Sequence, residues 1–366
     1  MPITRRSFIK TTAGALLAPT LYPITTSFAQ SAEWKTYEIT TEIVIDAPNQ
    51  KVQAWLPLPL IKDTDYFKTL SIKTDGDAKK TSIAKTPMGE TQMLWGQWDA
   101  STNTRNLVTT FVVSTRERNN QLSTPNKALV LSKEEQKFWT RGTEFLPTDG
   151  IVKEKANEII KPLAKDATDI DKAKAIYNWV VENTFRDPTT KGCGAGDVKL
   201  MLETNNLGGK CADINAVYVA LARSAGLPAR DVYGVRINDS ARGYKSLGKS
   251  VDISKAQHCR AEFFAKGYGW VAVDPADVRK VILEEPTNLT ATDPKVIAIR
   301  DYLFGNWEMN WMAYNYGHDI ILPGSRLGAK GKISFLMYPQ GETKEGRLDS
   351  LDPANFNYKI TSKLIG

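Results

Sequence analysis

The segment spanning residues 257–275 constrains the fold more than any other part of the sequence. Two apolar runs flank a glycine-containing turn here, which predicts a β-hairpin. If Lys266 is the centre of the turn, His258 lies eight residues before it and Asp274 eight residues after it. Residues equidistant from an antiparallel turn face each other, so we expect an imidazole beside a carboxylate. A register shift of one residue would leave the two as diagonal neighbours.

A cysteine stands immediately before a helical pattern. Cys211 follows two glycines and a lysine, and apolar residues then recur at helical spacing until Gly226 and Pro228. The free N–H groups and the dipole of a helix start stabilise a thiolate, which is the nucleophilic form of cysteine. Taken alone, Cys211 could equally be a buried structural cysteine. Together with His258 and Asp274, it matches the pattern of a nucleophile, a general base and an orienting carboxylate.

Four motifs within residues 170–285 together resemble the transglutaminase-like (papain-related) superfamily. They read Gly-Gly-Lys-Cys-Ala-Asp, Gly-Leu-Pro-Ala-Arg, Gln-His-Cys-Arg-Ala-Glu and Gly-Trp-Val-Ala-Val-Asp-Pro. The resemblance is strongest to bacterial exported members with an N-terminal β domain. It implies Cys211 as nucleophile, His258 as general base and Asp274 as orienting residue, with acyl transfer through a thioester. The family uses water or an amine as acceptor, and some members have lost these residues and only bind.

The whole chain predicts an α+β protein with several domains. Short strand-like runs without a helical period predict an N-terminal β-sandwich-like domain over residues 30–135. A papain-like, transglutaminase-like core, with a helix packed on an antiparallel sheet, is predicted over residues 136–290. A β-containing extension over residues 291–366 is predicted to hold strands at 332–338 and 356–361.

The first 29 residues predict an export signal. The run from Thr4 to Lys10 resembles the twin-arginine motif, and a short apolar stretch and small residues lead to Ala29. We therefore expect passage through the twin-arginine export machinery and cleavage after Ala29. The mature protein is expected to be periplasmic or secreted, with no membrane span.

Charge restricts the partners of the chain. The formal net charge is +7, and three of the positive charges lie in residues 1–29. The remaining excess is too small to indicate nucleic-acid binding. From the predicted location, we expect a peptide or protein substrate, plausibly of the cell envelope.

The three cysteines were also considered as metal ligands. Cys193, Cys211, Cys259 and His258 would make a zinc ligand set, but no Cys-x-x-Cys pair is present. His258 and Cys259 are also adjacent in a predicted strand and therefore point to opposite faces. We expect no metal site and no cofactor. Cys259 is expected to face the core. Cys193 either lines the cleft or, as the sequence favours, is a loop cysteine without a catalytic role.

The sequence thus favours an exported cysteine acyl-transfer enzyme that acts on amide bonds, most simply a peptidase or amidase. Two alternatives stay open. One is a protein-glutamine transamidase (cross-linking) enzyme that uses the same residues with an amine acceptor, and the other is a non-catalytic envelope binding module on the same fold. Asp197 and Asp213 are expected either to tune the site or to be ordinary helix-start acids. The aromatic run over residues 307–318 is predicted to pack in the core rather than to line a groove.

Overall fold

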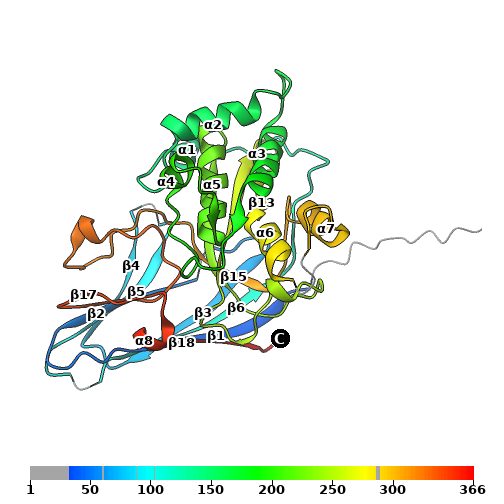
Figure 1. The fold of residues 1–366 in the computed structure, drawn as a ribbon. Helices are drawn as coiled ribbons and strands as arrows, with labels where there is room; N and C mark the ends of the chain where they lie inside the picture. The colour runs from blue at the N-terminus through cyan, green and yellow to red at the C-terminus, as the bar shows by residue number, and fades with distance from the viewer. Residues whose placement is uncertain (1–32, 60–61, 88, 103, 286–288) are drawn as a thin grey trace, which may run out of the picture. The chain divides into compact units, whose positions relative to one another are not determined.

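The structure of the protein is a computed structural model. It describes residues 33–59, 62–87, 89–102, 104–285 and 289–366. The predicted export signal over residues 1–29 lies outside the described residues. The part from Glu33 to Gly366 groups into one unit, whose elements are labelled in Figure 1. Among the described helices, none has the length and apolarity that a membrane span needs.

The first sheet has five antiparallel strands in the order β11-β18-β1-β6-β3. Buried and more exposed residues alternate along β1 and β6 because successive side chains of a strand point to opposite faces. The strands are β1 (Lys35–Val44), β3 (Phe67–Gly76), β6 (Asn106–Thr115), β11 (Val251–Asp252) and β18 (Tyr358–Leu364).

The second sheet is also antiparallel, in the order β17-β16-β2-β5-β4. Its strands are β2 (Val52–Pro57), β4 (Lys80–Lys85), β5 (Gln92–Trp98), β16 (Gln340–Thr343) and β17 (Gly346–Arg347). Ile39 and Phe111 of the first sheet and Leu56 and Trp98 of the second belong to one buried cluster. The N-terminal region is therefore sheet-rich, as the sequence predicts.

The C-terminal tail contributes strands to both of these sheets. β18 pairs with β1, and β16 pairs with β2. The strand predicted at 356–361 is present as β18, whereas residues 332–338 contribute only an isolated bridge between Ile333 and Ile320. Each sheet combines residues from both ends of the sequence. The domain boundaries predicted near residues 135 and 290 stay predictions.

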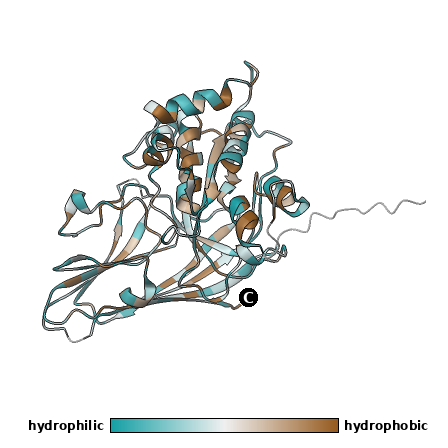
Figure 2. Ribbon diagram, viewed as in Figure 1, coloured by the Kyte–Doolittle hydropathy of each residue, from teal (hydrophilic) through white to brown (hydrophobic). Residues whose placement is uncertain are grey.

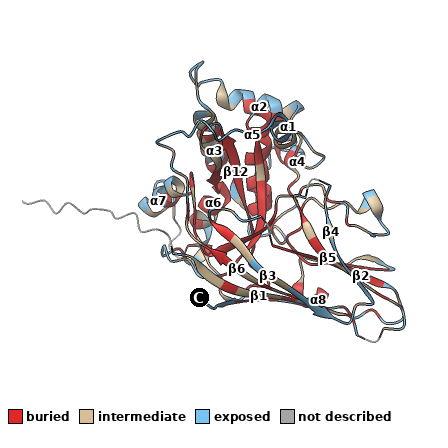
Figure 3. Cartoon of the chain, turned by 180° about the vertical axis from the view of Figure 1, so that it is seen from behind, coloured by how far each residue is buried: buried red, intermediate tan, exposed pale blue. Residues whose placement is uncertain are grey.

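The central unit is a helix packed on a four-stranded antiparallel sheet, which is the core that the sequence predicts. The sheet order is β13-β12-β10-β15. Its strands are β10 (Ala229–Arg236), β12 (Gln257–Ala265), β13 (Gly269–Val273) and β15 (Trp311–Asn315). Helix α5 (Cys211–Ser224) contacts β12 and β10, and every residue of α5 and β12 is buried. Figure 3 shows both elements in the colour of buried residues.

The other helices surround this core. Ser132 and Glu135 form a capping box at the start of α1, and α2, α3 and α6 pack against α5. Figure 2 shows that the helices mix hydrophobic and hydrophilic residues, as expected for elements with one face on a core. The helices are α1 (Lys133–Thr140), α2 (Gly150–Ile160), α3 (Asp169–Asn183), α4 (Val198–Glu203), α6 (Pro275–Glu284), α7 (Pro294–Tyr302) and α8 (Pro353–Phe356).

The remaining elements are short. Strand β8 pairs with β9 in parallel, and β7 pairs with β14. They are β7 (Arg118–Asn119), β8 (Phe185–Arg186), β9 (Gly208–Gly209), β14 (Asn306–Trp307) and the 3₁₀ helices Lys245–Leu247 and Gly328–Gly331.

The turn of the β12–β13 hairpin is centred one residue later than predicted, which shifts each cross-strand partner by two residues. Ala261 pairs with Val273 and Ala265 with Gly269, so the turn centres on Gly267 and not on Lys266. β13 ends at Val273, and the following Asp274 caps helix α6. His258 and Asp274 are therefore diagonal neighbours rather than directly opposed.

Candidate active site

Cys211 is the first residue of α5. The chain reaches it in extended form, because β9 pairs with β8 and Lys210 still has extended dihedrals (φ −116°, ψ −160°). The Cys211 side chain is only 4% exposed, and it lines a cleft of about 470 Å³. Cys193 and His258 line the same cleft. Three groups capable of acid–base or nucleophilic chemistry therefore meet in one cavity.

Asp213 holds the loop around Cys193 against the start of α5. Its Oδ1 accepts hydrogen bonds from the N–H groups of Ala195 and Gly196, both at 2.9 Å, and its Oδ2 accepts one from the N–H of Lys210, also at 2.9 Å. Burial raises the pKa of Asp213, although the hydrogen bond from Gly196 opposes this. Asp213 thus does more than cap a helix, because one carboxylate binds both segments that carry the cleft cysteines.

The loop approaches the helix too closely for most side chains. Gly194 has φ +96°, and a Cβ placed there would lie 1.7 Å from an oxygen of Asp213. Only glycine fits such a position. The carbonyl of Cys193 accepts a hydrogen bond from the N–H of Ala212 at 2.9 Å, so one of the free amides at the helix start is already used.

Replacing Asp213 with Asn tests this arrangement. An amide offers one acceptor oxygen where the carboxylate offers two, so either the loop or Lys210 loses its partner. We expect the free energy of unfolding to fall by about 2 kcal/mol, the usual cost of leaving buried groups unsatisfied. The alkylation rate of Cys211 should fall as well. Urea unfolding and iodoacetamide kinetics measure the two effects.

Asp197→Asn is the matched control. Asp197 caps α4 by accepting from the N–H of Leu200 at 3.0 Å, and Asn caps a helix about as well as Asp. Unfolding of this variant should be nearly unchanged. Equal unfolding midpoints for the Asp213 and Asp197 variants would contradict the role assigned to Asp213.

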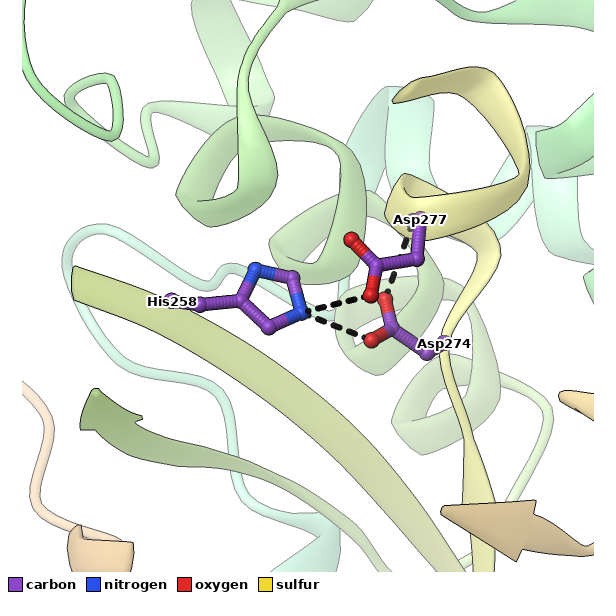
Figure 4. A group of neighbouring side chains, drawn as sticks. All are labelled: His258, Asp274 and Asp277. Atoms are coloured by element: carbon purple, nitrogen blue, oxygen red, sulfur yellow. Dashed lines mark hydrogen bonds and ion pairs between the residues drawn. The ribbon is translucent and has the colours of Figure 1, made fainter. Parts of the chain in front are cut away.

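His258 and Asp274 are in direct contact. The Nε2 atom of His258, on β12, lies 2.7 Å from Oδ2 of Asp274, and the side chains are 4% and 0% exposed. The Oδ1 atom of Asp274 accepts the N–H of Asp277, which fixes the carboxylate as the cap of α6. Figure 4 shows Nε2 facing the carboxylates, with Nδ1 on the other side of the ring.

A second carboxylate, which the sequence analysis missed, belongs to the same group. Oδ2 of Asp277 lies 3.4 Å from Nε2 of His258, and Oδ1 pairs with Arg236 at 2.6 Å. Asp277 lies three residues after Asp274, a spacing that places two side chains on one side of a helical turn. That spacing is the signal by which the sequence could have identified it.

Asn215 joins the three elements that carry the site. Its Nδ2 donates to the backbone carbonyl of Cys259 at 2.9 Å and to Oδ1 of Asp274 at 3.3 Å. Its Oδ1 accepts the N–H of Ala276 at 3.3 Å. The side chain is completely buried and links α5, β12 and α6. Asn215 therefore fixes the distance between the helix that carries Cys211 and the hairpin that carries His258.

The cleft favours a thiolate on Cys211. Hydrogen bonds from the thiols of Cys193 and Cys259 lower the pKa of Cys211 well below its ordinary value, and His258 adds to this against the opposing effect of burial. The hydrogen bond to Cys211 raises the pKa of Cys193, and burial raises that of Cys259. The charge therefore resides on the sulfur that stands at the helix start.

His258 favours the protonated form. Burial and Arg236 lower its pKa, but Asp277 and Asp274 outweigh them and raise the pKa of His258 to about 9. Burial and Asp277 raise the pKa of Asp274, whereas His258 and Arg260 lower it. A thiol with a low pKa beside an imidazole with a high one forms a thiolate–imidazolium pair near neutral pH.

The other two cysteines take different positions. Cys259 is completely buried, with its sulfur 3.9 Å from Nδ2 of Asn215. Cys193 lines the cleft, and its sulfur lies 3.3 Å from the carbonyl oxygen of Gln257. The sequence did not reveal how close Cys193 lies to Cys211, because the contact depends on the loop that Asp213 binds.

A metal ion has limited support at this site. Among the described residues, one atom each of His258, Asp274 and Asp277 lie within 4.8 Å of one another, whereas the three thiols and His258 do not form such a group. Arg236 pairs with Asp277, and Arg260 lies 3.8 Å from Asp274. These two cations occupy the carboxylates and oppose a third positive charge.

The family model described as the transglutaminase-like superfamily matches residues 154–275, which include Cys211, His258 and Asp274. The chain belongs to the transglutaminase-like superfamily. A protein of uncharacterised function from Haemophilus influenzae is 35% identical over 348 residues, covering 90% of this chain and 91% of its own. The fold is also similar to a crystal structure from Cytophaga hutchinsonii, provisionally named a cysteine protease. That structure has a TM-score of 0.50 at 13% identity and covers 90% of this chain and 98% of its own.

Membership of the transglutaminase-like superfamily indicates an enzyme of the cysteine-protease or transglutaminase type. Some residues that line the cleft of this chain, however, lie outside the range 154–275 that the family model matches. Lys280 and the tail residues Tyr338, Leu351 and Tyr358 line the cleft beside Cys211. Within the aromatic run over residues 307–318, Trp307, Trp311 and Tyr314 are buried, as predicted for core residues. Tyr314 and Tyr316 also line a second cavity, so the run does not pack in the core alone.

Proposed function

We propose that this transglutaminase-like protein is an exported cysteine acyl-transfer enzyme that cleaves amide bonds, most simply a peptidase or amidase. Cys211 is the nucleophile, His258 the general base and acid, and Asp274 the carboxylate that orients the imidazole. The buried 2.7 Å contact between His258 and Asp274, in the cleft that Cys211 lines, is the observation that carries this proposal. The twin-arginine-like start of the sequence supports export to the periplasm or the exterior, with cleavage after Ala29.

In the first half of the reaction, the Cys211 thiolate attacks the amide carbonyl carbon and forms a tetrahedral oxyanion. His258 then gives its proton to the departing amine nitrogen as the carbon–nitrogen bond breaks. A thioester between Cys211 and the acyl group remains. Asp274 holds His258 through Nε2, so the proton is transferred from Nδ1.

In the second half, His258 takes a proton from water as the water oxygen attacks the thioester carbon. The carbon–sulfur bond breaks, and the product is a carboxylic acid with the thiolate–imidazolium pair restored. The oxyanion of both steps needs a hydrogen-bond donor. Because Cys193 occupies the Ala212 amide, we assign this role to the N–H of Cys211 itself.

The rate of iodoacetamide alkylation against pH tests the proposed site. We expect Cys211 of the wild type to react well below the free-cysteine pKa of about 8.5. Cys211→Ala should remove this reaction, and His258→Ala should move it toward the ordinary pH range. Mass spectrometry of the alkylated peptide separates Cys211 from Cys193. An inert Cys211 in the folded protein would support a non-catalytic binding module instead.

The rate of amide cleavage should fall at high pH, whereas the rate of alkylation should not. Since the imidazolium donates the proton to the leaving amine, cleavage should decline as pH rises through the His258 pKa of about 9. Alkylation needs only the thiolate and should not decline there.

Product analysis of a peptide library with and without a primary amine separates hydrolysis from transamidation, which is the second candidate reaction.

A further inference from the structure

The cleft beside Cys211 carries an unusual charge distribution. Six cationic side chains line it, and among the described residues none of the lining side chains is acidic. The cationic residues are Arg186, Lys210, Arg236, Lys249, Lys255 and Lys280. They come from different parts of the chain, from β8 to α6, so the charge surrounds the reacting sulfur rather than lying along one element.

Half of these cations have carboxylate partners behind the cleft wall. Arg236 pairs with Asp277 at 2.6 Å, and Arg186 and Lys280 share Glu284. These ion pairs give Arg236, Arg186 and Lys280 a structural role that does not require a ligand. Their partners Asp277 and Glu284 do not themselves line the cleft.

The other three cations have no such explanation. Within the described part of the chain, Lys210, Lys249 and Lys255 form no ion pair, and Lys249 and Lys255 are exposed. The nearby carboxylate of Asp252 is directed to Ser254, from which it accepts the N–H at 3.1 Å and the hydroxyl at 2.7 Å. Like charges around one cavity repel each other, so this set is better suited to an anion that enters the cleft than to an empty one.

We propose that the cleft selects acidic peptides, with Lys249 and Lys255 binding carboxylate side chains that flank the reacting amide. This inference rests on the proposed acyl-transfer function for the site but concerns its substrate class. Tyr338, Leu351 and Tyr358 also line the cleft and are placed to contact the rest of the peptide.

The same charges bear on the acceptor of the acyl group. The ammonium group of a lysine side chain would be repelled from a cleft that six cationic residues already line. Water carries no such penalty. Selection of acidic peptides therefore agrees with hydrolysis rather than with cross-linking to protein lysines.

Binding to the Cys211→Ala protein tests this proposal without any need for turnover. The probes are three short peptides with a rhodamine label, identical except that two positions beside a central Gln carry Glu, Gln or Lys. We expect the Glu peptide to bind about tenfold more tightly than the Gln peptide, the sum of two modest charge pairs, and the Lys peptide to bind most weakly. Fluorescence anisotropy measures the dissociation constants, and the preference should shrink as salt shortens the screening length.

The Lys249→Gln/Lys255→Gln double variant, made in the Cys211→Ala protein, should bring the Glu peptide close to the Gln peptide. Lys153→Gln/Lys165→Gln is the matched control, because it removes the same charge from exposed positions that do not line the cleft. Equal binding of the Glu and Gln peptides, no binding of any peptide, or a preference that survives the cleft variant would each overturn the proposal. None of these results depends on the reactivity of Cys211, which the alkylation experiment measures separately.

Discussion

The Asp274→Asn variant should lose thiolate character at Cys211 and with it most of its catalytic rate. A full return of the thiol to an ordinary pKa of about 8.5 would leave only about 3% ionised at pH 7 and slow alkylation about 30-fold. This is the upper limit of the effect, because the thiols of Cys193 and Cys259 still lower the pKa of Cys211 in the variant. Amide cleavage should fall further, by about 10³- to 10⁴-fold, because the imidazole also takes the wrong tautomer.

The hydrogen bonds of Asp274 explain this expectation. Oδ1 accepts from the N–H of Asp277 and from Nδ2 of Asn215, while Oδ2 faces Nε2 of His258. All three neighbours are donors, and an amide has one acceptor oxygen. If that oxygen keeps the two donors at the helix cap, the NH₂ group faces Nε2 and forces the proton onto Nδ1. A neutral ring protonated at Nδ1 cannot accept a proton on the side where Cys211 is expected.

The Asp277→Asn variant distinguishes orientation of the His258 ring by Asp274 from the effect of a nearby negative charge. This variant keeps the 2.7 Å contact of Asp274 and removes only the carboxylate at 3.4 Å. It should lower stability, because Arg236 loses its buried partner, yet it should keep rapid alkylation at neutral pH. If Asp277→Asn abolished the low-pH reactivity while Asp274→Asn retained it, Asp277 would be the orienting group and our assignment would be wrong. Iodoacetamide profiles from pH 5 to 10 on both variants distinguish these outcomes.

The hairpin illustrates how far the sequence could predict this site. Strand pattern and turn chemistry are local, so they placed His258 and Asp274 near each other even though the turn was centred one residue too early. The predicted contact between His258 and Asp274 still forms, because Asp274 follows the strand and caps α6, where its carboxylate faces the imidazole.

The parts that the sequence did not predict depend on long-range contacts. Cys193 reaches the cleft through three amide hydrogen bonds to Asp213, and Arg236 meets Asp277 across 41 residues of sequence. The C-terminal strand β18 joins β1 at the opposite end of the chain. No periodicity or motif in a single sequence encodes such pairings, since each is decided by how separate elements pack.

Glu262 gives the second large expected effect, and it concerns stability rather than reactivity. This β12 side chain is 1% exposed and lies between two guanidinium groups, 2.5 Å from Arg118 and 2.5 Å from Arg230. Arg118 lies on β7, so the ion pairs of Glu262 with Arg118 and Arg230 connect the region after the N-terminal sheets to the central sheet. Glu262→Gln should lower the free energy of unfolding by about 3–5 kcal/mol, because it leaves two buried cations without their anion.

The matched control is Glu158→Gln on α2. Glu158 also pairs at 2.5 Å, with Lys155, but its side chain is 66% exposed. The two ion pairs have the same distance but different burial, so comparing them isolates the effect of burial. We expect Glu158→Gln to change the free energy of unfolding by less than about 0.5 kcal/mol in urea at pH 7. Comparable losses for the two variants would contradict the account.

The pH dependence of the Glu262→Gln loss provides a further check with a definite sign. Burial raises the pKa of Glu262, but Arg230 and Arg118 outweigh it and lower the pKa below the ordinary value. An acid with a lowered native pKa contributes stability that is complete above its unfolded pKa of about 4.3 and is lost as pH falls through the native one. The difference in unfolding free energy between the wild type and Glu262→Gln should therefore be constant from pH 8 to about 5 and shrink below pH 4. A difference that grew on acidification would mean that the native pKa of Glu262 lies above its unfolded value, so that burial outweighs the two arginines.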